Sequence, residues 1–181
     1  MAIKPNILLI VADQQRYDCI GKSGVCPVKT PNIDRLAKES MWFSNAFTAI
    51  PLCCPARQAI LNGQRPEVFG ALWNFNIALK THALQPSEYS WTNELKQIGY
   101  QMAYIGEWHV NPEYSPLEYG FDYYFGEEDY DEYRKAKYPN VKYYNGWLGE
   151  YDPIPVEDSR THYLAGLACE KIKEYSLKDV P

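Results

Sequence analysis

Two neighbouring cysteines, Cys53 and Cys54, are followed by Pro55 and, after one more residue, by Arg57. Vicinal cysteines form a disulfide only with strained geometry, so a redox pair is the weakest explanation for them. Proline favours the first turn of a helix, and a thiol at a helix N-terminus beside an arginine is favoured as an anion. The spacing is consistent with a nucleophilic thiolate, a redox-sensing thiol or an anion-binding turn.

Polar residues also follow two apolar runs of the sequence. Asp13 ends the run from Ile7 to Ala12, and Glu-Trp-His at 107–109 ends the run over 100–106. Continuous apolar, β-branched runs are typical of parallel strands that are buried on both faces. Since ligands bind at the carboxyl ends of parallel strands, we expect both clusters and the helix start at Cys53 to converge on one site.

Local start and stop signals predict four helices. They begin at Thr30-Pro31, near Pro55, at Ser90 and near Asp158, and the second and third end at Gly63 and Gly99. Ser and Thr accept N–H bonds at helix starts, Pro fits the first turn, and Gly adopts the left-handed conformation that ends a helix. Helices that alternate with apolar strands indicate an α/β fold with a largely parallel sheet flanked by helices.

The composition is that of an ordinary globular domain, with 181 residues, 46% hydrophobic and 23% charged. A net charge of −5 argues against a nucleic-acid or acidic-membrane partner. Five cysteines without a repeated C-x-x-C argue against a disulfide framework. The first apolar run is too short to cross a membrane and lacks the flanks of a signal peptide, so we expect a cytoplasmic protein without a membrane partner.

The stretch from 112 to 155 is rich in Tyr, Asp, Glu, Gly and Pro and shows no clean period of two or 3.6 residues. It is too aromatic for a disordered linker. We expect an ordered insertion or lid, over 126–157, built from short strands or turns. A substrate-facing role for its aromatic residues is the sharper alternative.

Four segments of the chain resemble the sulfatases of the alkaline-phosphatase-like superfamily. Cys53-Cys54-Pro55-Ala56-Arg57 resembles the family signature C-x-P-x-R, and the "QAILNG" that follows has Asn62 in place of the family's threonine. The other three segments are "KPNILLIVADQQRYD", "TPNIDRLAKESMWFSNAF" and "TNELKQIGYQMAYIGEWHV". Together they cover nearly all of residues 4 to 125 in the family's order, so the resemblance implies an alkaline-phosphatase/sulfatase-like fold.

The resemblance implies a specific chemistry for these residues. Cys53 would be oxidised by a formylglycine-generating enzyme to formylglycine, whose hydrate is the nucleophile, and Arg57 would hold that hydrate. Asp13, Gln14 and the modified Cys53 would bind a divalent metal, typically Ca²⁺, which prefers oxygen ligands. His109 would position the reacting group or transfer a proton. The substrate would be a small-molecule or carbohydrate sulfate ester.

Two departures from the family pattern stand out. Where the family has G-K-W-H, this chain has Gly106-Glu107-Trp108-His109, with Glu107 in place of the lysine. A carboxylate there would repel a sulfate at close range. Either Glu107 turns away, another cation compensates it, or the chain is impaired or has a different substrate. The chain is also less than half the usual length of the family, so we expect an N-terminal portion with an incomplete sheet. In this scheme 1–125 belong to the catalytic domain, 126–157 to the insertion, and 158–181 to a helix of the same domain.

Two other functions stay open from the sequence. Phosphonate monoester and phosphodiester hydrolases of the same superfamily also use an Asp-Gln pair and C-x-P-x-R. A non-catalytic, sulfatase-like fragment is the second alternative, because Glu107 reverses a charge and the family's second half is absent. Asn74 follows the signature closely and is a candidate for substrate binding, whereas motif-free residues such as His82 are more often structural.

Overall fold

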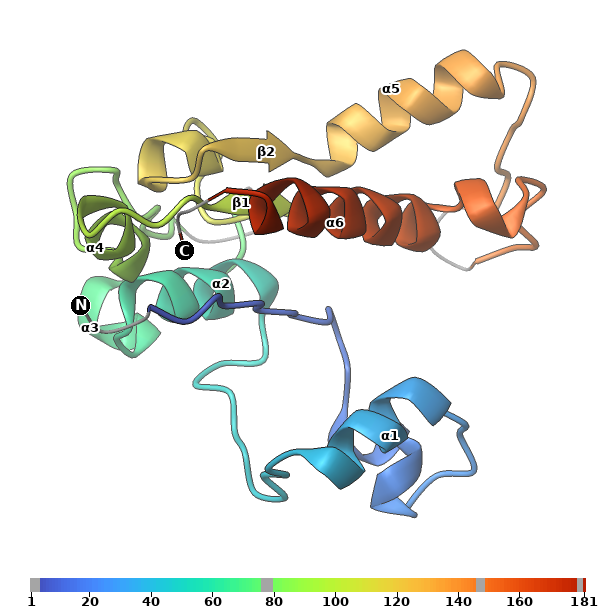
Figure 1. The fold of residues 1–181 in the computed structure, drawn as a ribbon, viewed down its shortest axis with the longest axis horizontal. Coiled ribbons are helices and arrows are strands. Elements are labelled where there is room, and N and C mark those ends of the chain that lie inside the picture. Colours follow the sequence, from blue (N-terminus) through green and yellow to red (C-terminus); the bar gives the residue numbers. More distant parts are fainter. Residues whose placement is uncertain (1–3, 76–79, 146–148, 179–180) are drawn as a thin grey trace.

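The computed structural model describes residues 4–75, 80–145, 149–178 and 181 (Figure 1). These residues form α-helices, short 3₁₀ helices (η) and two strands. In chain order they are η1 (Tyr17–Cys19), η2 (Gly21–Ser23), α1 (Pro31–Glu39), α2 (Cys53–Asn62), α3 (Pro66–Phe69), α4 (Trp91–Gln97), β1 (Ala103–Ile105), η3 (Pro116–Tyr119), β2 (Tyr123–Phe125), α5 (Glu127–Lys137), η5 (Val156–Asp158) and α6 (Arg160–Ser176).

The two strands lie parallel, with Ala103 opposite Tyr123 and Ile105 opposite Phe125. Helix α6 packs along β1, and α2 lies below α6 and the strands in the view of Figure 1. The blue segment around α1 stands apart from this body of the molecule (Figure 1). The arrangement is a partial α/β domain with a parallel sheet and flanking helices, as the sequence predicts.

The predicted helices form where their local signals place them. Helix α2 ends at Gly63, which has a φ of 75° and donates its N–H to the carbonyl of Ala59. At the start of α4, the Ser90 hydroxyl accepts the N–H of Asn93. Pro31 opens α1, as a residue with a fixed φ and no N–H should. These ends are set by residues close in sequence, which is why the sequence alone predicts them.

The predicted strand from Ile7 to Ala12 is wrong. The structure has no regular secondary structure there, and the side chains of Ile7 to Val11 are exposed, Ile10 by 77%. A strand requires a neighbour for its N–H and C=O groups. In the described part of the chain β1 and β2 pair only with each other, so the apolar run has no neighbour to bind.

A small aromatic core joins α2 to the segments around the sheet. Leu61 of α2 packs with Leu84, Trp108, Val110 and Tyr119, all buried. The Trp108 ring meets Tyr104 edge-on at 5.1 Å between centroids, and Tyr104 meets Phe121 in the same way at 5.4 Å. This cluster fixes the segment that follows β1 against α2, and both carry predicted site residues.

The tyrosine-rich stretch contains a helix, α5, rather than only short strands or turns, so that expectation is corrected. Acidic residues fill its first turn and basic residues its last, which favours a helix through its dipole. Tyr133 of α5 stacks on Tyr163 of α6 at 4.2 Å between centroids. Residues 146–148 of this stretch lie outside the described residues. The domain boundaries proposed from the sequence, at 125/126 and 157/158, stay predictions.

Candidate active site

Cys53 is the first residue of α2 and is half-buried. The preceding residue, Leu52, has no side chain that can cap the helix. Instead, the side-chain oxygen of Asn74 accepts the N–H of Cys54 at 3.0 Å. Asn74 thus takes the place of an N-cap from twenty residues along the chain. The positive end of the helix dipole is directed to the region around Cys53, and favours an anionic group there.

The second cysteine, Cys54, is packed in the interior of the protein. Cys54 is completely buried, and the Gln58 side-chain amide donates to its sulfur at 3.1 Å. Burial is the main cause that raises the pKa of the Cys54 thiol. The same Gln58 donates to the carbonyl of His82 and accepts the N–H of Leu84 at 2.8 Å. Cys54 is therefore a packed thiol, and only Cys53 of the pair is accessible for chemistry.

Arg57 lies one turn after Cys53 and connects two predicted site segments to α2. Its Nη1 donates to the main-chain carbonyl of Glu107 at 2.8 Å, and its Nη2 to the Glu107 carboxylate at 2.5 Å. The same Nη2 lies 3.5 Å from the carboxylate of Asp13. The Arg57 side chain is only 13% exposed. Three regions that are far apart in sequence meet at this one guanidinium, although Asp13 does not follow a strand as the strand-edge argument expected.

The segment after β1 is held so that alternate residues face opposite ways. Gly106 donates its N–H to Phe125 at 2.9 Å, which fixes the segment to β2. Trp108 is buried, and its indole N–H donates to the carbonyl of Tyr114 at 2.8 Å. With Trp108 in the core, Glu107 and His109 on either side of it are free to meet α2. The G-E-W-H sequence thus supplies one anchor and two site residues.

Two residues of the site adopt a backbone conformation that is uncommon for non-glycine residues. Gln14 has a φ of 54° and His109 a φ of 48°. Such left-handed residues cost free energy and persist where the surroundings fix them, often at functional sites. Among the described non-glycine residues these are the two with positive φ, and the sequence had indicated both for the site.

The Glu107 carboxylate lies between two basic side chains. Its Oε1 is 3.4 Å from Nδ1 of His109, a buried atom without a hydrogen-bond partner in the described chain. The His109 ring, followed by the Arg57 guanidinium, lowers the pKa of the Glu107 carboxyl, while partial burial acts the other way. Phe75 meets the His109 ring edge-on at 5.9 Å between centroids. Glu107 is thus held as an anion.

Tyr104 is a member of the site that the sequence did not indicate. Its hydroxyl donates to the main-chain carbonyl of Glu107 at 2.6 Å, beside the Arg57 bond to the same oxygen. Burial raises the pKa of Tyr104, and the Arg57 charge lowers it to a smaller extent. Its position could have indicated it, because Tyr104 lies on the predicted strand over 100–106, three residues before Glu107. Gln58, which supports Cys54, was missed as well.

The metal ligands implied by the sequence form only part of a site. Ca²⁺ takes six to eight oxygen ligands. The Asp13 carboxylate lies near the Arg57 guanidinium, and Gln14 follows it, but within the ranges described here no three His, Cys, Asp or Glu residues gather to hold a metal. The described residues do not by themselves fit the ligand requirement of Ca²⁺.

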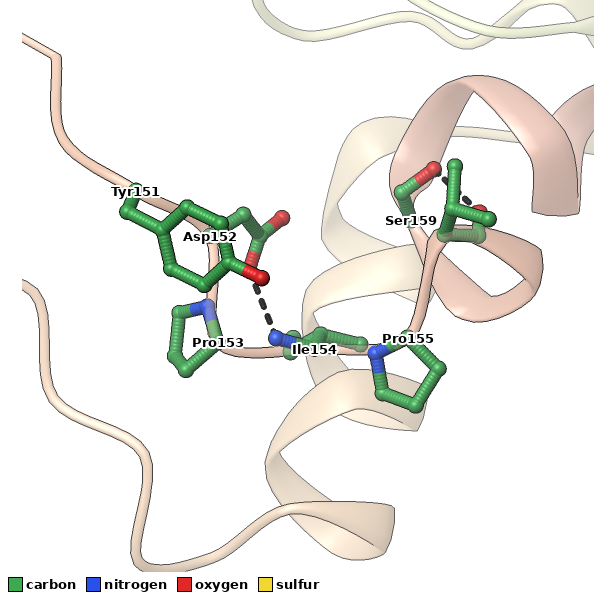
Figure 2. Close-up of a pocket in the computed structure, with 7 residues that line it drawn as sticks. Tyr151, Asp152, Pro153, Ile154, Pro155 and Ser159 are labelled. Atoms are coloured by element: carbon green, nitrogen blue, oxygen red, sulfur yellow. Dashed lines mark hydrogen bonds between the residues drawn. The ribbon is translucent and has the colours of Figure 1, made fainter.

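A separate surface hollow lies at the approach to α6 (Figure 2). It is lined by Tyr151, Asp152, Pro153, Ile154, Pro155, Val156 and Ser159. The Asp152 carboxylate accepts the N–H of Ile154 at 3.1 Å, so it already has a hydrogen-bond partner within its own loop. None of the predicted site residues lines this hollow. In the described ranges, no helix has both the length and the apolar character needed to cross a membrane.

Comparisons with known proteins identify the family of this chain. The Sulfatase family model matches residues 5–175. The chain is 37% identical over 172 residues to the ulvan-active sulfatase of Formosa agariphila, covering 89% of this chain and 32% of that protein. It is 34% identical over 160 residues to the N-acetylgalactosamine-6-sulfatase of Homo sapiens, covering 81% and 31%.

A solved structure shows the same fold. The crystal structure of Ps i-CgsB matches with a TM-score of 0.71 and 30% identity, covering 98% of this chain and 43% of that one. The same protein has been crystallised with k-i-k-neocarrahexaose. The predicted sulfatase-like α/β fold is confirmed, and this chain spans about a third of the length of the curated relatives it matches. The chain belongs to the sulfatase family of hydrolases.

Proposed function

We propose that this chain is the N-terminal part of a sulfuric ester hydrolase whose nucleophile is a formylglycine made from Cys53. One observation carries the proposal: Cys53 begins α2, and Arg57, one turn later, binds the segments that hold Asp13 and Glu107. Family membership supports it. The half-buried position of Cys53 and the dipole of α2 suit a polar, oxygen-bearing side chain.

The residues around Cys53 have distinct roles in this proposal. The hydrate of the aldehyde would supply an oxygen nucleophile that attacks sulfur while the ester S–O bond breaks and the alcohol leaves. The second hydroxyl of the hydrate would then expel sulfate and regenerate the aldehyde. Arg57 places a guanidinium one turn after Cys53 on the same helix. His109, whose Nδ1 is buried near Glu107, has its remaining ring nitrogen for positioning or for moving a proton. Asp13 and Gln14 would hold a divalent cation only with ligands from outside the described residues.

The relatives suggest the substrate class and the maturation partner. Two are named for ulvan and for N-acetylgalactosamine 6-sulfate, and the solved neighbour was crystallised with a neocarrahexaose. We therefore propose a sulfated carbohydrate as substrate. We also propose a formylglycine-generating enzyme as the partner that acts on the Cys53 segment.

A second candidate is a sulfatase-like protein without activity. One observation favours it: a carboxylate, Glu107, is paired with Arg57 where the family has a lysine. A positive contact for a sulfate is thereby replaced by a neutralised ion pair.

The test compares two esters and two cysteines. The protein that carries this chain is produced together with a formylglycine-generating enzyme and assayed on para-nitrophenyl sulfate and on bis(para-nitrophenyl) phosphate. Sulfate hydrolysis that is lost in Cys53→Ala and kept in Cys169→Ala, an exposed thiol, supports the proposal. Faster phosphodiester hydrolysis would identify the phosphodiesterase alternative. An aldehyde at position 53 without hydrolysis of either ester would support the inactive protein.

A further inference from the structure

Glu107 contacts three residues of the site, Arg57, Tyr104 and His109, through its main-chain oxygen and its carboxylate. Its main-chain oxygen accepts from Arg57 Nη1 at 2.8 Å and from the Tyr104 hydroxyl at 2.6 Å. Its carboxylate accepts from Arg57 Nη2 at 2.5 Å, and its other oxygen lies 3.4 Å from His109 Nδ1. The Glu107 side chain is 28% exposed, so most of it is enclosed by these partners.

The contact with Arg57 has the geometry of a positioning clamp. A guanidinium is planar and carries its N–H donors in a fixed fork, so two acceptors on one residue fix both its place and its plane. Here the two acceptors are the carbonyl and the carboxylate of Glu107. A lysine at 107 could offer the carbonyl but not the carboxylate, and its ammonium would lie close to the guanidinium.

We propose that Glu107 is a positioning residue that orients Arg57 and His109 toward Cys53, in place of the substrate contact that the family's lysine would make. The inference rests on the proposed function for the identity of the reacting group. The contacts of Glu107 with Arg57 and His109 are independent of that identity. The buried Trp108 anchors the main chain next to Glu107. Arg57 and His109 contact the Glu107 carboxylate itself.

This role predicts an order among substitutions at position 107. Glu107→Gln keeps an oxygen acceptor for Arg57 and should lose the least activity. Glu107→Ala removes the carboxylate contact, and we expect kcat on para-nitrophenyl sulfate to fall by about 10- to 100-fold, since small misplacements of reacting groups have effects of that size. Glu107→Lys should be the worst, because it brings a positive charge against Arg57. KM should change less than kcat, since the lost contact acts on the reacting groups.

The experiment measures kcat, KM and the aldehyde content at Cys53 for each variant of the protein that carries this chain. The control is Glu113→Lys, which makes the same charge change at an exposed glutamate of the same loop and should leave kcat unchanged. A Glu107→Lys protein with activity equal to or above that of the wild type would overturn the inference. That result would show that position 107 is a substrate contact lacking its lysine.

A second readout separates this inference from the proposed function. In protein labelled with isotopic arginine, nuclear magnetic resonance should show Arg57 guanidinium protons protected from exchange, with the signal assigned by its loss in Arg57→Lys. The protection should fall in Glu107→Ala and persist in Glu113→Lys. If the wild type hydrolyses no sulfate but this pattern is found, the proposed function fails and the clamp stands. If the guanidinium protons exchange freely in the wild type, the clamp is wrong.

Discussion

The Arg57 guanidinium binds Glu107 at two points, the main-chain carbonyl at 2.8 Å and the carboxylate at 2.5 Å. In sequence, Glu107 is a reversed charge in a family motif. In the structure, that charge has a partner from the C-x-P-x-R signature itself. Of the explanations open from the sequence, the geometry corresponds to a compensating cation, which is supplied by Arg57.

The first prediction concerns the free energy of this contact. The pair is partly enclosed, with side chains 13% and 28% exposed, so its strength should exceed that of a surface ion pair. A double-mutant cycle with Arg57→Ala, Glu107→Ala and the double variant, followed by urea unfolding, should give a coupling of about 1–2 kcal/mol. The same cycle on the exposed pair Arg65–Glu67 is the control and should give less. Equal coupling in the two cycles would contradict an enclosed Arg57–Glu107 contact.

The second prediction concerns Gln58, which is completely buried under the Cys53 turn. Gln58→Ala leaves the N–H of Leu84 and the carbonyl of His82 without their partner and opens a void. Unsatisfied buried groups of this kind should lower the free energy of unfolding by about 3 kcal/mol. Gln97→Ala, on an exposed helix position, should change it by roughly 0.5 kcal/mol or less. Urea unfolding measures the free energy of unfolding of both variants. An equally small decrease in Gln58→Ala and Gln97→Ala would show that the Gln58 contacts are not formed.

The third prediction concerns Asn74 as the cap of α2. Asn74→Ala removes the acceptor for the Cys54 N–H and should cost about 1 kcal/mol of stability, as the loss of a helix cap does. Asn74→Asp keeps an acceptor oxygen and adds a negative charge at a helix N-terminus, so its stability should stay close to that of the wild type. Thermal unfolding of the two variants is the measurement. An Asp variant as unstable as the Ala variant would argue against a capping role.

The helices show how much of this fold can be predicted from sequence. Ser90, Gly63 and Pro31 act within a few residues of themselves, so their helix ends follow from local chemistry, whereas the predicted Thr30 cap is wrong because its hydroxyl accepts the N–H of Gly21 instead. The run from Ile7 to Val11 is different, because a strand exists only if another strand binds it, and composition carries no information about that partner. Helix α5 was missed because its aliphatic content is low. Its signal was the separation of acidic and basic residues between its two ends.

The site also has contacts that the sequence can predict and contacts that it cannot. The Glu107 segment follows strand β1 as the strand-edge rule expects, whereas Asp13 lies near Arg57 without the predicted strand before it. The sequence could not show that Asn74 caps α2 or that Tyr104 binds the Glu107 carbonyl, because both contacts depend on how distant segments pack. It also could not show which way the Glu107 carboxylate points, since that is set by Trp108 in the core.

The fourth prediction concerns how the stability contributed by Glu107 changes at acidic pH. The pKa of Glu107 in the folded chain lies below its ordinary value of 4.5. The stability that Glu107 contributes should therefore be complete above pH 4.5 and be lost as the pH falls through the lower, folded-state value. The difference in unfolding free energy between wild type and Glu107→Gln should shrink on acidification. A difference that stays constant from neutral pH to pH below 4 would contradict the ion pair.

The Asp158 cluster provides an internal comparison for that titration. Hydrogen bonds from Lys137, and then from Tyr138 and Tyr133, lower the pKa of Asp158 to about 2. Its contribution to stability should also decline with acid, as the pH falls from 3.8 toward about 2. The difference in unfolding free energy between wild type and Asp158→Asn should therefore shrink over that pH interval.

The most direct test of the central claim is mass spectrometry of the tryptic peptide that carries position 53. The peptide is taken from the protein produced together with a formylglycine-generating enzyme. The account predicts an aldehyde at position 53, trapped by a hydroxylamine or hydrazide probe, with Cys54 in the same peptide still a thiol. Cys53→Ala should abolish the trapped product. An unmodified thiol at Cys53 under these conditions, or an aldehyde at Cys54 instead, would contradict the account.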